Sequence, residues 1–191
     1  KYFLFALFPF LFSNTFSQQM WTWEELTPMP EKTSNNAVVE AEFSAEMYVY
    51  SFGGIGESKS YSSIHNRSYR MKISTNTWET IPDIPGGAKK IAMGASYVKD
   101  KIYIMGGYTV SSKGAEKSYD NVHVFDPILN DFITPGAPIP TPIDDHVQTV
   151  WRDSLIFIVT GWSDTQNVPD VMVYDPTFDS WQIGTSVPSN T

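Results

Sequence analysis

The feature that most constrains the fold of this chain is a motif that occurs three times at nearly constant spacing. An apolar run ends each time at a glycine pair or its equivalent: Gly53-Gly54, Gly106-Gly107 and Thr160-Gly161. The first positions of these pairs are 53 and then 54 residues apart. Self-similarity with a period of about fifty residues, rich in short strands, is typical of a propeller array. We therefore expect a fold built from copies of one four-stranded unit.

Each copy continues with a hairpin that large apolar side chains flank. These side chains lie seven positions apart, as Met71 and Trp78, Phe125 and Phe132, and Tyr174 and Trp181. A turn former stands two positions before the second member of each pair: Asn76, Asn130 and Asp179. Such residues bond to nearby backbone and favour tight turns. Each copy then ends at a proline: Pro85, Pro140 and Pro188.

Together these motifs resemble the kelch repeat. Its pattern is a diglycine ending the second strand, a tyrosine and a tryptophan flanking the next hairpin, and a Met-Pro or similar ending. The sequence departs from it at Thr160, Phe132 and Met71, and the resemblance covers nearly everything from Trp21 onward. It implies an all-β fold, a kelch-type β-propeller with three complete four-stranded blades.

The expected propeller is partial and occupies residues 18–191, with blades at 37–85, 91–140 and 146–188. Strands are expected at 37–42, 46–53, 68–73 and 78–84, at 91–98, 101–107, 121–126 and 132–138, and at 146–152, 155–161, 170–175 and 181–187. Residues 18–30 match the last strand of a repeat, so we expect them to form the outer strand that closes the ring. Given one closing strand and three complete blades, we expect a whole ring of six blades, with seven as the alternative.

The first 17 residues have the pattern of a secretory signal peptide. Lys1 precedes an apolar run over residues 2–12, and small polar residues follow it. That run is too short to span a bilayer. We expect a secreted or periplasmic protein with no membrane span in the mature chain; the alternative for the run is a buried core helix.

Composition excludes several classes of function. The formal net charge is −8, and no basic run offers contacts for phosphates, so we expect no nucleic-acid partner. The absence of cysteine excludes disulfides and thiolate metal sites within the sequence. We expect neither a metal nor a cofactor.

Candidate binding residues lie in the loops at the mouth of the expected channel, where propellers carry function. One set of loops, at the same distance after each closing proline, leads into the innermost strand of a blade. A second set, residues 55–63, 108–119 and 162–169, joins strands two and three and is expected to have no structure of its own. The candidates are Asn35, Asn36, Lys89, Lys90, Asp144, Asp145, His146 and Trp162.

Each candidate has a specific and a general interpretation. His146, beside Asp144 and Asp145, suits a general base or a metal ligand, or else the three residues form the polar start of a strand. Lys89 and Lys90 suit an anionic sugar, or else form a solvated loop whose truncation leaves stability unchanged. Trp162 suits stacking on a sugar or peptide, or else packing between blades.

The leading hypothesis is a non-catalytic binding module for a protein or glycan. The alternative is an enzyme similar to the bacterial kelch epimerase that interconverts the anomers of sialic acid (N-acetylneuraminate), with catalytic residues partly outside this sequence. No position can be assigned to that family's acid-base residues. A third class is a copper oxidase resembling galactose oxidase, whose radical cofactor requires a cysteine, so this sequence by itself cannot build that site.

Overall fold

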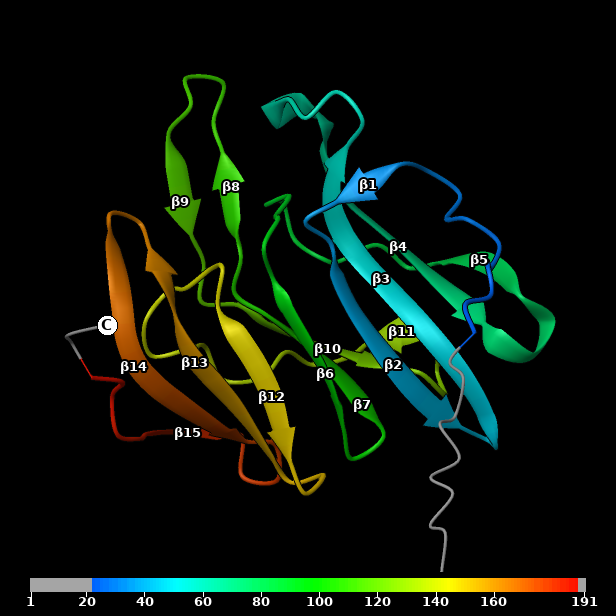
Figure 1. Cartoon of the computed structure of the whole chain (residues 1–191). Coiled ribbons are helices and arrows are strands. Elements are labelled where there is room, and N and C mark those ends of the chain that lie inside the picture. Colours follow the sequence, from blue (N-terminus) through cyan, green and yellow to red (C-terminus); the bar gives the residue numbers. More distant parts are fainter. Residues whose placement is uncertain (1–21, 189–191) are drawn as a thin grey trace, which may run out of the picture.

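The computed structural model describes residues 22–188 and shows an all-β fold. Within that range, three antiparallel sheets stand side by side like the blades of a fan, as Figure 1 shows. Each blade is a meander in which sequential strands pair with one another. The expected all-β, propeller-type fold is confirmed. The expected signal peptide, residues 1–17, lies outside the described residues.

The strands of the three blades follow the chain in order. Blade 1 contains β2 (Ala37–Phe43), β3 (Glu46–Gly56), β4 (Ile64–Lys72) and β5 (Thr77–Ile81), with the short β1 (Thr33–Ser34) on the end of β3. Blade 2 contains β6 (Gly94–Val98), β7 (Lys101–Met105), β10 (Val122–Asp126) and β11 (Asp131–Phe132). Blade 3 contains β12 (Val147–Trp151), β13 (Leu155–Ser163), β14 (Gln166–Asp175) and β15 (Ser180–Ile183). A separate hairpin, β8 (Tyr108–Val110) and β9 (Glu116–Ser118), and two 3₁₀ turns, η1 (Tyr61–Ser63) and η2 (Ile73–Thr75), complete the elements.

The fourth strand of blade 2 is much shorter than expected. The sequence predicts a strand over 132–138, but β11 ends at Phe132. Beyond it the backbone keeps only scattered bonds to β10, such as Gly136 N to Val122 O. Pro135 and Pro138 have no N–H to donate, so a continuous ladder cannot form there.

The closing strand expected over 18–30 is not formed in the described part of that segment. Residues 22–30 have no strand conformation. They are tied to blade 1 instead, since Thr27 N donates to Asn76 Oδ1 at 2.8 Å and Trp78 Nε1 donates to Thr27 O at 2.9 Å. A strand needs a hydrogen-bonded neighbour, and the described strands supply none here, so the closing strand stays a prediction.

The core lies between the blades. On β7, Ile102 and Ile104 face blade 1, whereas Tyr103 and Met105 face blade 3. Because blades cover both faces of this strand, its sequence is apolar without alternation. Burying each such side chain contributes about 1.5–3 kcal/mol.

In the range 22–188, no helix has the length and apolar character needed to cross a bilayer.

The glycine pairs allow neighbouring blades to approach each other. A Cβ on Gly106 would lie 2.3 Å from Ile143 O, which belongs to the segment that leads into blade 3. Gly107 N donates to the same carbonyl at 2.9 Å, and at the first junction Gly54 N and Lys90 O lie 3.4 Å apart. The pairs therefore serve the junctions between blades.

The first prediction separates backbone strain from steric conflict at these glycines. Gly106 has φ +66° and no room for a Cβ; Gly114 has φ +78° and open space around it; Gly87 has open space without a positive φ. We expect Gly106→Ala to lower the free energy of unfolding by about 2–4 kcal/mol, and Gly114→Ala by about 1 kcal/mol. Gly87→Ala should change it by less than about 0.5 kcal/mol. Denaturant unfolding measures all three, and equal losses at Gly106 and Gly114 would contradict the junction role.

Candidate functional site

The predicted site residues all lie at one end of the three sheets. Strands alternate in direction within each meander, so the β3–β4 and β5–β6 connections fall at the same end of the blades. This end carries the β8–β9 hairpin and η1, at the top of Figure 1. We call it the loop face. The segments that lead into the inner strands, residues 31–36, 88–93 and 141–146, also lie here; we call them the leading segments.

Backbone geometry corrects the alignment of the leading segments. Asn35, Ala92 and Asp145 share a left-handed conformation, with φ of 53°, 55° and 47°. They are also bonded in series, since Ala92 N donates to Asn35 O at 3.1 Å and Asp145 N to Ala92 O at 3.3 Å. The expected equivalence of Lys89-Lys90 with Asn35-Asn36 is therefore wrong. The linker before blade 2 contains Gly86-Gly87 and is two residues longer than the others.

Lys90 is not the solvated loop residue that the sequence suggested. Its side chain is 1% exposed, whereas Lys89 is exposed. Lys90 Nζ donates to Asn121 Oδ1 and to His123 Nε2, both at 3.1 Å. Burial lowers the pKa of Lys90 from 10.5 to about 8, although the charge of Asp120 opposes the shift. Burial, and then the charge of Lys90, lower the pKa of His123 to about 4, so its imidazole is neutral and can accept this bond.

Lys90 lines a cleft of about 550 Å³ on the loop face. Tyr119 lies in the wall, with Lys90 Nζ and Lys117 Nζ 5.5 and 5.2 Å from the centre of its ring. Both contacts are of the cation–π type. The cleft can therefore present ammonium groups to a ligand.

The structure brings Asp144 and Trp162 together, and the pair joins the segment that leads into blade 3 to the end of β13. Their backbones bond to each other at 2.9 Å in both directions. Asp144 is buried, which raises the pKa of its carboxyl group, and its Oδ2 accepts from Ser118 Oγ at 2.5 Å. Ser118 also exchanges bonds with Asp164, whose carbonyl accepts from Trp162 Nε1 at 3.1 Å. Trp162 is half-buried and borders another cleft, of about 680 Å³, on the edge of blade 3.

His146 does not form an acid-base group with its aspartate neighbours. Its Nε2 lies 3.1 Å from Gln148 Oε1, and Gln148 Nε2 donates to Ser96 Oγ on blade 2. Burial lowers the pKa of the imidazole. Within residues 22–188, no group of three or more histidine or acidic side chains is placed to hold a metal ion. His146 therefore contributes to the junction of blades 2 and 3.

Asn35 and Asn36 differ in exposure, as Lys89 and Lys90 do. Asn35 is exposed, whereas Asn36 is half-buried and its Nδ2 donates to Ser51 Oγ at 2.8 Å. Asp145 is exposed beside Asn35 in the bonded series of leading segments. Of the eight candidates, those open to a partner are therefore Asn35, Lys89 and Asp145.

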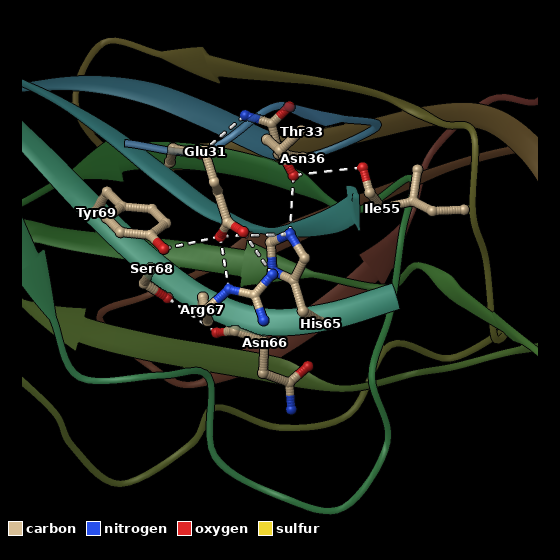
Figure 2. A network of polar contacts seen from close by, with 10 residues as sticks. Glu31, Thr33, Asn36, Ile55, His65, Asn66, Arg67, Ser68 and Tyr69 are labelled. Carbon is tan, nitrogen blue, oxygen red and sulfur yellow. Dashed lines mark hydrogen bonds and ion pairs between the residues drawn. The ribbon is translucent and has the colours of Figure 1, made fainter. Parts of the chain in front are cut away.

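A polar network in blade 1 was missed from sequence. Figure 2 shows Glu31 in contact with Arg67, Tyr69 and His65. Both carboxylate oxygens accept from Arg67 at 2.6 Å, and Oε1 also accepts from Tyr69 at 2.7 Å. Chiefly the Arg67 bonds lower the pKa of Glu31, while burial lowers the pKa of His65. Glu31, His65 and Arg67 border a cleft of about 450 Å³, together with Lys32 and Lys89.

The two polar clusters share a sequence signal. His65, Arg67 and Tyr69 alternate along the third strand of blade 1, and Tyr119, Asn121 and His123 occupy matching places in blade 2. Residues two apart in a strand face the same side. This alternation of polar and aromatic side chains is the sequence signal by which the two clusters could have been found.

The second set of loops was expected to have no structure of its own, and this is wrong for two of the three. Residues 108–119 form a hairpin, and residues 162–169 largely extend β13 and β14.

Comparison with known proteins decides the family. Residues 11–189 match the family described as the KLHDC2/KLHL20/DRC7 Kelch-repeats domain. The chain belongs to this kelch-repeat family. Kelch-like protein 25 of Xenopus tropicalis is 29% identical over 171 residues, which cover 87% of this chain and 25% of that protein. A solved structure, that of YjhT, has a TM-score of 0.64 at 16% identity and covers 86% of this chain and 54% of that one. The kelch chain thus spans about a quarter and about half of these relatives.

The second prediction uses the burial of Lys90. A lysine whose folded pKa is depressed binds fewer protons when folded than when unfolded, so its contribution to stability rises with pH through that window. Between pH 8 and 10, we expect the wild type to gain about 2 kcal/mol relative to Lys90→Met. Lys89→Met, the exposed neighbour, should follow the wild type throughout. Urea unfolding at each pH measures the difference, and parallel curves for wild type and Lys90→Met would contradict the burial.

The third prediction concerns Glu31. A carboxyl group with a depressed pKa stabilises the fold above its ordinary pKa, and this contribution is lost as the pH falls through the folded-state value. We expect Glu31→Gln to cost about 1–2 kcal/mol at pH 7 and to flatten the loss of stability at acid pH. The control is Glu57→Gln, an exposed glutamate that pairs with Lys32. An acid unfolding profile of Glu31→Gln as steep as that of the wild type would refute the assignment.

Proposed function

We propose that this kelch protein is an exported binding module that recognises a protein or glycan partner through its loop face. Kelch propellers generally bind proteins, which favours a protein partner. The observation that carries the proposal is the convergence of three leading segments and three second loops on one face, where two clefts of about 550 and 450 Å³ lie. Concave sites of this size, lined by a few polar groups, suit ligand recognition.

The loop face combines a rigid base with exposed groups. Backbone bonds link Asn35, Ala92 and Asp145, and Ser118 ties the blade 2 hairpin to the blade 3 loop through Asp164. Exposed side chains on such a base lose little further freedom on binding, which favours affinity. Lys89 and Asp145 are placed to contact a partner in this way.

The sialic acid mutarotase remains the alternative and rests on sequence resemblance. An enzyme of this type needs a general acid and base facing the substrate. Among the described residues, His146 bonds to Gln148 and Asp144 to Ser118, so neither of these two candidates is placed to act as a general acid or base on a ligand. The geometry therefore favours binding.

The fourth prediction maps the binding face directly. A photo-crosslinking amino acid would replace Lys89 or Asp145 on the loop face, and Arg152 in the hairpin at the opposite end of blade 3 as the control. We expect one partner to be crosslinked from positions 89 and 145 of the full-length protein in its native cells, and not from 152. Equal crosslinking from all three positions, or crosslinking from 152 alone, would overturn the assignment of the face.

A further inference from the structure

Lys90 is a buried cation that forms no ion pair with the carboxylates of the described residues. No carboxylate of residues 22–188 forms an ion pair with its Nζ, which bonds only to the neutral side chains of Asn121 and His123. An ammonium group carries three donors, and these two acceptors satisfy two of them. Burying an unpaired charge is costly, so such a group needs a reason to be present.

The fold itself does not require a lysine here. Backbone alignment of the leading segments places Lys90 in the same position as Thr33 of blade 1 and Ile143 of blade 3. Ile143 is fully buried against apolar neighbours such as Val168 and Met172. An uncharged side chain thus suffices at this position in both neighbouring blades. The charge of Lys90 therefore indicates a role other than folding.

The surroundings of Lys90 favour an anion. Lys117 shares the ring of Tyr119 with it, and Asp120 is the acidic residue that lines the same cleft. With His123 neutral, the lining of this cleft carries one positive charge in excess, in a chain whose net charge is −8. The cleft is therefore a local positive region on a chain that is negatively charged as a whole.

A second cleft, of about 530 Å³, adjoins the first and is apolar. Both are lined by Pro85, Gly86, Asn121 and His123. The second continues along Phe132 and Ile133, and Ile133 is 38% exposed. The imidazole of His123 lies edge-on to the Phe132 ring, with centroids 6.3 Å apart. A ligand that fills both clefts would place a charged group and an apolar group on either side of His123.

We propose that the two clefts bind an acidic and apolar segment of the partner, with an oxyanion at Lys90 and an aromatic or aliphatic group against Phe132 and Ile133. The anion is a carboxylate or a phosphate, which share this chemistry. The inference rests on the proposed binding function and specifies what the partner presents. An oxyanion would accept the free donor of Lys90 in a charge-assisted hydrogen bond.

The test uses small probes, so it does not depend on finding the partner. Full-length protein would be titrated with 4-phenylbutyrate, 4-phenylbutyl phosphate and the neutral 4-phenylbutanol, and the imidazole proton signals of His123 would be followed by NMR. We expect both anions to shift these signals and the alcohol to bind about tenfold more weakly or worse. The tighter of the two anions identifies the oxyanion. Above pH 8, binding should weaken towards tenfold per pH unit as Lys90 loses its proton.

Variants separate the two halves of the site. Lys90→Met should weaken the anions at least about tenfold and leave the alcohol unchanged, whereas Lys99→Met, in the exposed β6–β7 turn at the opposite end of blade 2, should change neither. Ile133→Asn, at an exposed position of the apolar cleft, should weaken all three probes. Circular dichroism would confirm that each variant is folded, and the pH series on the wild type tests the charge without any substitution.

The proposal would be overturned by anions that bind no better than the alcohol, by affinity that is independent of pH between 7 and 10, or by undiminished binding to folded Lys90→Met. Crosslinking from positions 89 and 145 would then still support the loop face as a binding surface. Conversely, anion binding with no crosslinking would confine the failure to the proposed function.

Discussion

The structure depends on the close approach of each blade's backbone to the segment that leads into the next blade. At the junction of blades 2 and 3, the Gly107 N–H donates to Ile143 O, and Gly106 leaves no space for a Cβ beside that carbonyl. This approach brings the apolar faces of neighbouring sheets together, so that Tyr103 and Met105 pack with Ile156 and Ile158. Backbone bonds of this kind also hold the leading segments on the loop face.

Because backbone bonds and apolar packing hold the blades, the side chains of the leading segments are free to differ. The equivalent positions carry Thr33, Lys90 and Ile143, in turn polar, cationic and apolar. The residues that they contact on the third strand differ correspondingly. Thr33 bonds to His65, Lys90 bonds to His123, and Ile143 lies in the same apolar cluster as Met172. In each blade the two side chains are of similar polarity, polar beside polar in blades 1 and 2 and apolar beside apolar in blade 3. The same scaffold thus offers different chemistry at each junction.

The sequence predicted the fold well because its signals were periodic. The glycine pairs, the hairpin turns and the apolar runs recur in phase, and the structure places four strands in each blade close to the expected positions, although the fourth strand of blade 2 ends at Phe132. The site was predicted less well because the leading segments were aligned by their distance from the closing proline, and the length of this linker differs between blades. Two extra residues at Gly86-Gly87 moved Lys89 and Lys90 out of the expected alignment, and nothing local reveals that Lys90 is buried. Its burial depends on β10, more than thirty residues away in sequence.

The candidate residues that proved structural show why polar loop residues are ambiguous evidence for function. Asp144 and His146 have side chains typical of catalytic sites, yet each satisfies a partner across a junction, Ser118 in one case and Gln148 in the other. Burial shifts the pKa of both, so a perturbed pKa here reflects packing rather than catalysis. Lys90 differs because no carboxylate of residues 22–188 forms an ion pair with it and its position has uncharged equivalents in both neighbouring blades. An unmatched charge that the scaffold does not need is stronger evidence for a ligand than the residue type alone.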